Sequence, residues 1–167
     1  MNKINLFISK NYLNRDNFFR EILKLMEIKE YNVIKNKYGK PYFEKENIYF
    51  NLSHSKEYIA AAFYKKEIGI DIQDIKPVSE RMYRRCLSFK EQECINDTDF
   101  DKDTWFTYIW TRKEAYIKYL GKSILTDLSV INVLDMDYIY SDFIEEYCLS
   151  IYIKKERKKP EVCLMYI

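Results

Sequence analysis

Glycine, proline, cysteine and histidine are scarce in this chain of 167 residues, which has three glycines, three prolines, four cysteines and one histidine. The cysteines form no Cys-x-x-Cys pair and have only that histidine to accompany them, so neither a zinc site nor a disulfide framework is indicated. Thiols of this kind fit a reducing cytoplasm. No apolar run approaches the ~20 residues that cross a bilayer, and the N-terminus lacks the features of a signal peptide. We therefore expect a cytoplasmic protein without a membrane partner.

The charge of the chain is nearly balanced, since 28 Lys and Arg residues face 26 Asp and Glu residues for a net charge of +2. This balance disfavours a general nucleic-acid binder. A hydrophobic fraction of 47% is enough for a core, and the length predicts a single domain over residues 1–167. The longest charge run, residues 154–159, lies between two strand-like segments and is typical of a solvated hairpin turn.

The residue patterns predict an α+β chain. Asn14 can cap a helix whose apolar residues recur at helical spacing up to Met26. Ser88 and Glu91 have the spacing of a capping box, and the strongest helical pattern runs from about residue 104 to 120, ending at Gly121. Short β-rich segments at 48–52, 58–64 and 67–72, separated by turn-length gaps, favour an antiparallel meander. Further strands are expected at 3–8, 31–34, 128–134, 147–154 and 162–167. The order of elements suggests two related α+β halves, approximately residues 1–75 and 76–167.

The glycines and two of the three prolines lie in or directly beside four short blocks. Gly39 and Gly69 fall within blocks that also carry a lysine or an acidic residue, where glycine permits a bend or a close approach. The blocks are Tyr38-Gly39-Lys40-Pro41, Asn51-Leu52-Ser53-His54-Ser55, Ile68-Gly69-Ile70-Asp71-Ile72-Gln73 and Trp110-Thr111-Arg112-Lys113-Glu114-Ala115-Tyr116-Ile117-Lys118. Together they suit a phosphate-rich ligand held by cations and a divalent metal.

Acidic residues in the last two blocks are candidate metal ligands. Asp71 is embedded in an apolar strand, where a carboxylate is costly to bury without a cation or hydrogen bonds. Alternation places Gln73 on the same side, and if this strand lies against the long helix, Asp71, Gln73 and Glu114 offer oxygens to one Mg²⁺. The alternatives are a strand-end Asp71 that fixes a turn, and a helix-surface ion pair between Glu114 and Lys118.

Hydrogen-bond donors gather in the first two blocks. Lys40, Ser53 and His54 offer donors that suit phosphate oxygens, although a lone histidine is also commonly structural. Neighbouring side chains on a strand point to opposite faces, so Ser53 and His54 do not form a hydrolase dyad. The chain has no GxSxG, Walker or Rossmann motif.

In their order and separation, the four blocks resemble the 4′-phosphopantetheinyl transferases, specifically the Sfp-like branch found with nonribosomal peptide and polyketide pathways. That family shows a YGKP-type turn, N-[IL]-S-H-S, G-[IV]-D-[IV]-E and W-x-x-K-E-x-x-x-K. The resemblance covers roughly residues 15 to 133. It implies a monomeric pseudo-dimer of two α+β halves, here with a shortened N-terminal half. It also implies transfer of phosphopantetheine from coenzyme A to a serine of an apo acyl or peptidyl carrier protein, with release of 3′,5′-ADP.

The resemblance also implies roles for individual residues. Asp71 and Glu114 would bind Mg²⁺, with Mn²⁺ as an alternative, and Gln73 would replace a glutamate of the family. Glu91 matches an acidic residue that is sometimes assigned to deprotonate the carrier serine. The implied catalytic residues are Asp71, Glu91, Glu114 and Lys118, and the implied coenzyme A contacts are Arg15, Lys40, Pro41, Ser53, His54, Lys113 and Lys118.

Two departures from the family and one surface bear on these expectations. Gln73 is a neutral, weaker ligand than glutamate. The region before Arg15 lacks the basic helix of Sfp-like members, so coenzyme affinity falls unless another basic group compensates.

The segment between the metal strand and the long helix mixes cations with apolar residues, which suits an acidic carrier protein or a solvated helix face. Its residues are Lys76, Arg81, Met82, Tyr83, Arg84, Arg85, Leu87, Phe89 and Lys90. The rival hypotheses are a non-catalytic coenzyme A or carrier-protein binding module and a different phosphate-transfer enzyme.

Overall fold

The protein has a mixed α+β fold in a computed structural model that describes residues 3–12, 14–45, 47–121 and 127–167. The helices are α1 (Arg15–Leu25), α2 (Glu80–Cys86), α3 (Phe89–Glu93) and α4 (Lys102–Leu120), with 3-10 turns η1 (Cys94–Asp97) and η2 (Leu128–Val130). The strands are β1 (Lys3–Lys10), β2 (Val33–Lys35), β3 (Pro41–Phe43), β4 (Tyr49–Ser55), β5 (Tyr58–Tyr64), β6 (Ile68–Asp74), β7 (Ile139–Ile144), β8 (Tyr147–Ile153) and β9 (Glu161–Tyr166).

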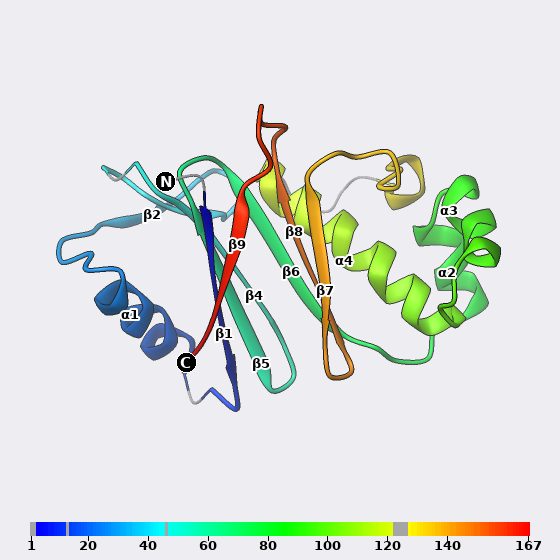
Figure 1. Cartoon of the computed structure of the whole chain (residues 1–167), viewed down its shortest axis with the longest axis horizontal. Coiled ribbons are helices and arrows are strands. Elements are labelled where there is room, and N and C mark those ends of the chain that lie inside the picture. Colours follow the sequence, from blue (N-terminus) through cyan, green and yellow to red (C-terminus); the bar gives the residue numbers. More distant parts are fainter. Residues whose placement is uncertain (1–2, 13, 46, 122–126) are drawn as a thin grey trace.

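The strands form two main sheets and a small ribbon. One sheet has the order β4-β5-β1-β9, the second has the order β6-β8-β7, and β2 pairs with β3. The last strand, β9, pairs in parallel with the first strand, β1, which ties the two ends of the chain to one sheet. Figure 1 shows α1 at the left and α4 toward the right, with the four-stranded sheet between them.

Alternation along the strands separates the apolar core into layers. On β1, Phe7 packs with the α1 residues Phe18 and Ile22, whereas its neighbour Leu6 packs with Ile70 of the second sheet. Because successive strand residues point to opposite faces, one face of the four-stranded sheet meets α1 and the other meets the three-stranded sheet. A third cluster lies along α4 and includes Trp105, Ile109, Leu87 and Val133.

Gly69 brings β6 into direct contact with α4. A Cβ atom at this position would lie 2.0 Å from the Ala115 carbonyl oxygen and 2.4 Å from the Tyr119 backbone nitrogen. No larger residue fits without a shift of the backbone. Residues of β6 that share the face of Gly69, beginning with Asp71, are therefore placed against the last two turns of α4.

Several local predictions from the sequence are confirmed. Asn14 caps α1 through bonds that its side chain accepts from the Asp16 and Asn17 amides. Ser88 and Glu91 form the predicted capping box of α3. Helix α4 ends at Gly121, whose φ of 60° is left-handed. These features depend on neighbours within a few residues, which is why the sequence reveals them.

Three predictions about strand arrangement were wrong. Strand β6 pairs with β8 and leaves the predicted meander after β5, because its Gly69 face packs on α4. Residues 128–134, all of them described, contain the turn η2 and no strand, since the Asp127 side chain caps the turn and the Leu128 carbonyl accepts from Lys113. Residues 154–159 form no hairpin turn, because β8 and β9 belong to different sheets.

Candidate active site at the contact between α4 and β6

Asp71 and Lys118 form the centre of the site. The Lys118 ammonium donates to Asp71 Oδ1 at 2.7 Å and to Ser53 Oγ at 2.8 Å, and Ser53 in turn donates to Asp71 Oδ1 at 2.8 Å. Asp71 is buried, whereas the Lys118 side chain keeps 29% of its surface exposed. A buried aspartate is thus joined to a lysine that still reaches solvent, which is a suitable arrangement for meeting an anionic ligand.

Glu114 lies one helical turn before Lys118 and is 6% exposed. Burial and the charge of Asp71 raise the pKa of Glu114 from its ordinary value of 4.5 to about 7, and Lys118 opposes this rise. Its Oε1 has no hydrogen-bond partner within the described part of the chain. A buried carboxylate without a partner is unfavourable, so a cation bound here would compensate it.

The donor set around Asp71 fits a hard divalent cation. Two buried carboxylates, Asp71 and Glu114, lie on facing elements, and one oxygen of Glu114 is left unsatisfied. The described residues contain no cluster of three or more His, Cys, Asp or Glu side chains able to hold a metal. Mg²⁺ commonly takes one or two carboxylates and fills its other positions with water and phosphate oxygens. Gln73, on the same face as Asp71, donates to Asp74 Oδ1 at 2.6 Å.

Glu91 and Lys113 form a separate ion pair that is closed to solvent. Their charged groups are 2.6 Å apart, and both side chains are 0% exposed. Lys113 also donates to the carbonyls of Cys86 and Leu128, while Glu91 accepts from the amides of Ser88 and Val133. Burial lowers the pKa of Lys113, and the contact with Glu91 counters this effect. The pair therefore joins α2, α3 and η2 to the middle of α4.

Lys40 is likewise engaged within the protein. Its ammonium donates to Glu67 at 2.5 Å and to the carbonyls of Ile68 and Tyr119, both at 3.1 Å. Only 11% of the Lys40 side chain is exposed. Lys40 thus links the turn before β3 to the start of β6 and the end of α4, next to the close contact at Gly69.

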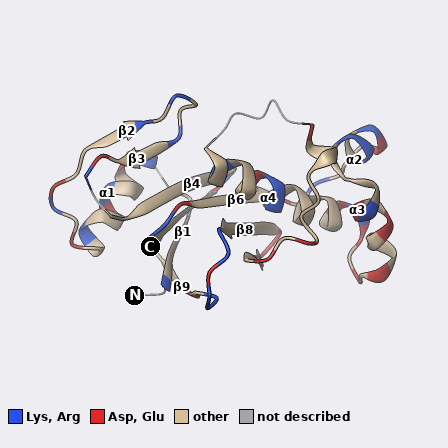
Figure 2. Cartoon of the chain, turned by 90° about the horizontal axis from the view of Figure 1, so that it is seen from above, with Lys and Arg blue, Asp and Glu red and all other residues tan. Residues whose placement is uncertain are grey.

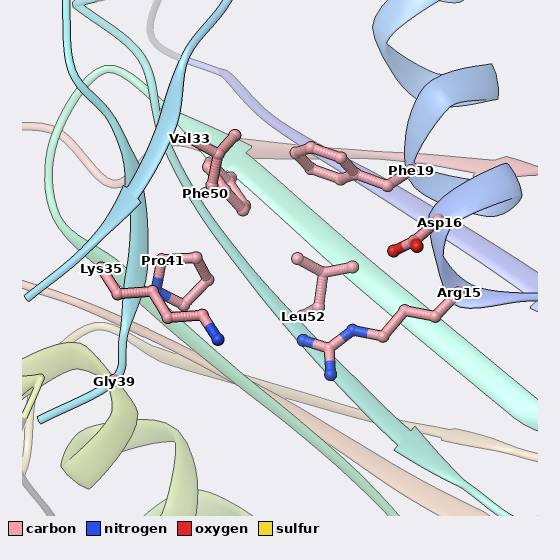
Figure 3. A pocket seen from close by; sticks show the side chains of 9 residues that line it. All are labelled: Arg15, Asp16, Phe19, Val33, Lys35, Gly39, Pro41, Phe50 and Leu52. Carbon is pink, nitrogen blue, oxygen red and sulfur yellow. The ribbon is translucent and has the colours of Figure 1, made fainter.

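The other predicted coenzyme contacts lie on the far side of β4. A pocket of about 380 Å³ is lined by Arg15, Asp16, Phe19, Val33, Lys35, Gly39, Pro41, Phe50 and Leu52. Figure 3 shows Arg15 and Lys35 extending toward the same space between α1 and the β2–β3 ribbon. His54 follows Leu52 on the same face of β4 and is exposed, with its ring 6.5 Å from that of Tyr12. The sequence reasoning missed Lys35, which the ribbon places opposite Pro41.

Comparison with known proteins decides the family. The family model of the 4′-phosphopantetheinyl transferase superfamily matches residues 67–157, which is more than half of the chain. The chain belongs to the 4′-phosphopantetheinyl transferase superfamily. The matched segment contains Asp71, Glu91, Lys113, Glu114 and Lys118, so it includes both the centre of the site and the buried ion pair.

Curated relatives from the same superfamily confirm the resemblance to the Sfp-like branch. The 4′-phosphopantetheinyl transferase Sfp of Bacillus subtilis is 36% identical over 98 residues, which are 58% of this chain and 44% of the relative. The transferase psf-1 of Bacillus pumilus is 36% identical over 93 residues, 54% of this chain and 40% of the relative. The transferase gsp of Aneurinibacillus migulanus is 31% identical over 128 residues, 68% of this chain and 53% of the relative. The chain therefore spans about half the length of the phosphopantetheinyl transferases it matches.

Proposed function

We propose that this protein transfers 4′-phosphopantetheine from coenzyme A to a serine of an apo acyl or peptidyl carrier protein, releasing 3′,5′-ADP. The observation that carries the proposal is the meeting of Asp71, Glu114 and Lys118 where α4 packs on β6. In a member of the phosphopantetheinyl transferase superfamily, two carboxylates that would hold a metal ion, together with a lysine beside them, would suit the pyrophosphate of coenzyme A. The nucleophile belongs to the carrier protein, so the chain itself needs no nucleophilic serine or cysteine.

Asp71 and Glu114 would hold Mg²⁺, with Mn²⁺ as an alternative, and Gln73 would add an amide oxygen or face a bound water. The unsatisfied Oε1 of Glu114 supports this assignment, because a cation would remove the cost of burying it. When bound, the ion would neutralise negative charge on the pyrophosphate oxygens.

Lys118 would stabilise the leaving group. In the reaction, the serine oxygen bonds to the β-phosphorus and its proton passes to a general base, while the bond from that phosphorus to the bridging oxygen breaks and 3′,5′-ADP leaves with the bridging oxygen. Negative charge grows on that oxygen, and a preorganised cation stabilises it. Lys118 is preorganised by two hydrogen bonds. Glu91, the predicted acceptor of the serine proton, would have to separate from Lys113 before it could act.

The pocket beside α1 would hold the nucleotide end of coenzyme A. Its volume of about 380 Å³ falls within the range of small-molecule sites. Arg15 and Lys35 would supply positive charge for the 3′-phosphate. His54 follows Leu52 on the pocket-facing side of β4 and would add a further donor. Lys35 would thus add to this pocket a basic group that the sequence patterns did not indicate. The pyrophosphate would lie nearer to Asp71 of β6 and to Ser53, which is on the other face of β4 and donates to Asp71.

An exposed rim of cations and apolar side chains would receive the carrier protein. Arg81, Arg84 and Arg85 are exposed on α2, as are Met82 at 43% and Phe89 of α3 at 76%. Figure 2 shows blue positions on both short helices. A neighbouring cavity of about 300 Å³ is lined by Gln73, Asp74, Lys76, Pro77, Val78, Ser79, Met82, Phe106, Thr107 and Trp110. An acidic helix of a carrier protein would complement this surface.

The arrangement of the chain as a monomeric pseudo-dimer in the cytoplasm is part of the same proposal. Each main sheet carries its own long helix, α1 for one and α4 for the other, which supports two halves of similar construction. Among the described residues, no helix is long and apolar enough to cross a membrane.

Release of 3′,5′-ADP tests the proposal against its rival, a binding module without turnover. The protein is incubated with coenzyme A, Mg²⁺ and an apo carrier protein, and the products are separated by chromatography. The proposal predicts carrier-dependent release of 3′,5′-ADP that is lost in Glu114→Gln, while the affinity for the carrier is retained. Binding of both ligands without release of 3′,5′-ADP would favour the binding module.

A further inference from the structure

Strand β4 presents two chemically different faces. Phe50 and Leu52 point to the side of α1 and line the pocket there. Their neighbours Asn51, Ser53 and Ser55 point the other way, and all three are buried. In the block Asn51–Ser55, alternate side chains therefore face the pocket beside α1, and the others face β6 of the three-stranded sheet.

The second set forms a ladder of side chains along β6. Strands β4 and β6 are edge strands of different sheets. The Ile70 amide donates to Asn51 Oδ1 at 3.0 Å, the Ile72 amide donates to Ser53 Oγ at 3.3 Å, and the Asp74 amide donates to Ser55 Oγ at 3.2 Å. Buried backbone amides need partners, and here the partners are side chains two residues apart on β4.

Ser53 is the member of this ladder that also touches the candidate active site. A serine hydroxyl has one donor and two acceptor positions. Ser53 donates to Asp71 Oδ1 and accepts from the Ile72 amide and from the Lys118 ammonium. All three positions are thus used, so Ser53 would have to break one of these bonds to contact a phosphate oxygen.

Ser55 makes the matching contacts with Asp74, which is ion-paired with Lys56 of the following turn at 2.8 Å. It accepts from the Asp74 amide and donates to Asp74 Oδ1 at 2.9 Å, and it is 7% exposed compared with 6% for Ser53. The two serines thus make equivalent contacts with β6. Of the two serines, Ser53 alone adds a bond to a lysine of α4 within the part of the chain that the structure describes.

We propose that Ser53 is a positioning residue that fixes Lys118 and Asp71 relative to each other across the joint between β4, β6 and α4. Its part in transfer rests on the proposed function, whereas the anchoring of Lys118 does not. The long side chain of Lys118 would otherwise sample many rotamers, and a hydroxyl that contacts both partners restricts it to one geometry.

A double-mutant cycle on the ligand-free protein tests the anchoring. Ser53→Ala, Lys118→Met and the double variant are unfolded in urea, alongside the same cycle built with Ser55→Ala. In the Ser53 cycle, the change in the unfolding constant of the double variant should differ by at least about threefold from the product of the single changes. In the Ser55 cycle the two effects should multiply. Equal behaviour of the two cycles would overturn the proposal.

Transfer kinetics test the positioning role. Ser53→Ala should lower kcat at least about tenfold in the wild-type chain and less than about twofold in the Lys118→Met background, with Ser53→Thr restoring most of the rate. A rise in the KM for coenzyme A at unchanged kcat would instead show direct coenzyme binding by Ser53 and would overturn the proposal. Should Ser53→Ala not fold, Ser53→Cys, a weak donor and acceptor of similar size, takes its place.

Failure of the proposed function is distinguishable from failure of this inference. A wild-type chain that transfers nothing would refute the function and the kinetic role of Ser53, while the unfolding cycle would still decide whether Ser53 anchors Lys118.

Discussion

Substitution of Glu114 by glutamine should stabilise the metal-free protein while it abolishes transfer. Glu114 is buried next to Asp71, and its Oε1 lacks a hydrogen-bond partner among the described residues. An amide of the same shape carries no charge to desolvate, and its N–H groups can donate to Asp71. Glu114 is therefore needed for the proposed reaction and at the same time lowers the stability of the ligand-free protein.

The magnitude follows from the pKa of Glu114. Because the pKa is raised on folding, from 4.5 to about 7, the folded state holds its proton over a pH range in which the unfolded state has lost it. Stability therefore falls as the pH rises through this window, and the full cost is present above pH 7. Each pKa unit is worth about 1.4 kcal/mol, so the cost reaches about 3 kcal/mol.

Urea unfolding between about pH 4.5 and pH 8 measures this cost. Glu114→Gln should gain up to about 3 kcal/mol over the wild type at the upper end of the range, and the gain should vanish at the lower end. The exposed Glu30→Gln is the matched control and should show no such trend. Mg²⁺ should raise the stability of the wild type at the upper end and leave Glu114→Gln unchanged. A Glu114→Gln variant that is less stable than the wild type at about pH 8 would refute the reasoning.

Three further substitutions test other parts of the structure. Gly69→Ala forces a Cβ onto the Ala115 carbonyl and should cost about 3 kcal/mol or more in urea unfolding, and a cost below about 0.5 kcal/mol would contradict the packing of β6 on α4. Glu91→Ala leaves the Lys113 charge buried without its partner and should cost about 3–5 kcal/mol, measured by thermal unfolding; a stability close to that of the wild type would show that the pair is not needed. Gln73→Glu adds a charged ligand and should lower the Mg²⁺ concentration for half-maximal transfer at preserved or higher activity, whereas a higher requirement would place Gln73 outside the metal site.

Local features of the fold were predictable because their causes lie close together in sequence. Asn14 accepts from amides two and three residues away. The Ser88 side chain accepts from the Glu91 amide, and the Glu91 side chain accepts from the Ser88 amide. Gly121 ends α4 because it adopts a left-handed conformation at the last turn. None of these features depends on which distant segment packs nearby.

Strand partners were harder to predict because alternation shows which face of a strand is buried and not which strand lies beside it. Strand β6 looked like the third strand of a meander, yet the surface of α4 against Gly69 and the side chains of Ser53 and Ser55 place it at the edge of a second sheet. The parallel pairing of β9 with β1 joins segments at opposite ends of the chain. Such pairings depend on tertiary contacts that no short window contains.

The candidate site shows the same division. The residue patterns predicted that Asp71 and Glu114 lie together only if the strand of Asp71 packs against the long helix, and the structure shows that packing and a bond from Lys118 to Asp71. The sequence did not reveal that Lys113 is fully buried against Glu91 or that Lys35 faces Arg15 across a pocket. A lysine on a helix or on a short ribbon strand has no local signal that distinguishes burial from exposure.

The central claim, transfer of phosphopantetheine to a carrier protein, is tested most directly by intact-protein mass spectrometry. Several apo carrier proteins are incubated with the wild-type chain, coenzyme A and Mg²⁺, with EDTA and with Asp71→Ala as controls. At least one carrier should gain the mass of one phosphopantetheine group, and both controls should abolish the gain. Binding of coenzyme A without a mass gain on any carrier, or full activity in a folded Asp71→Ala variant, would contradict it.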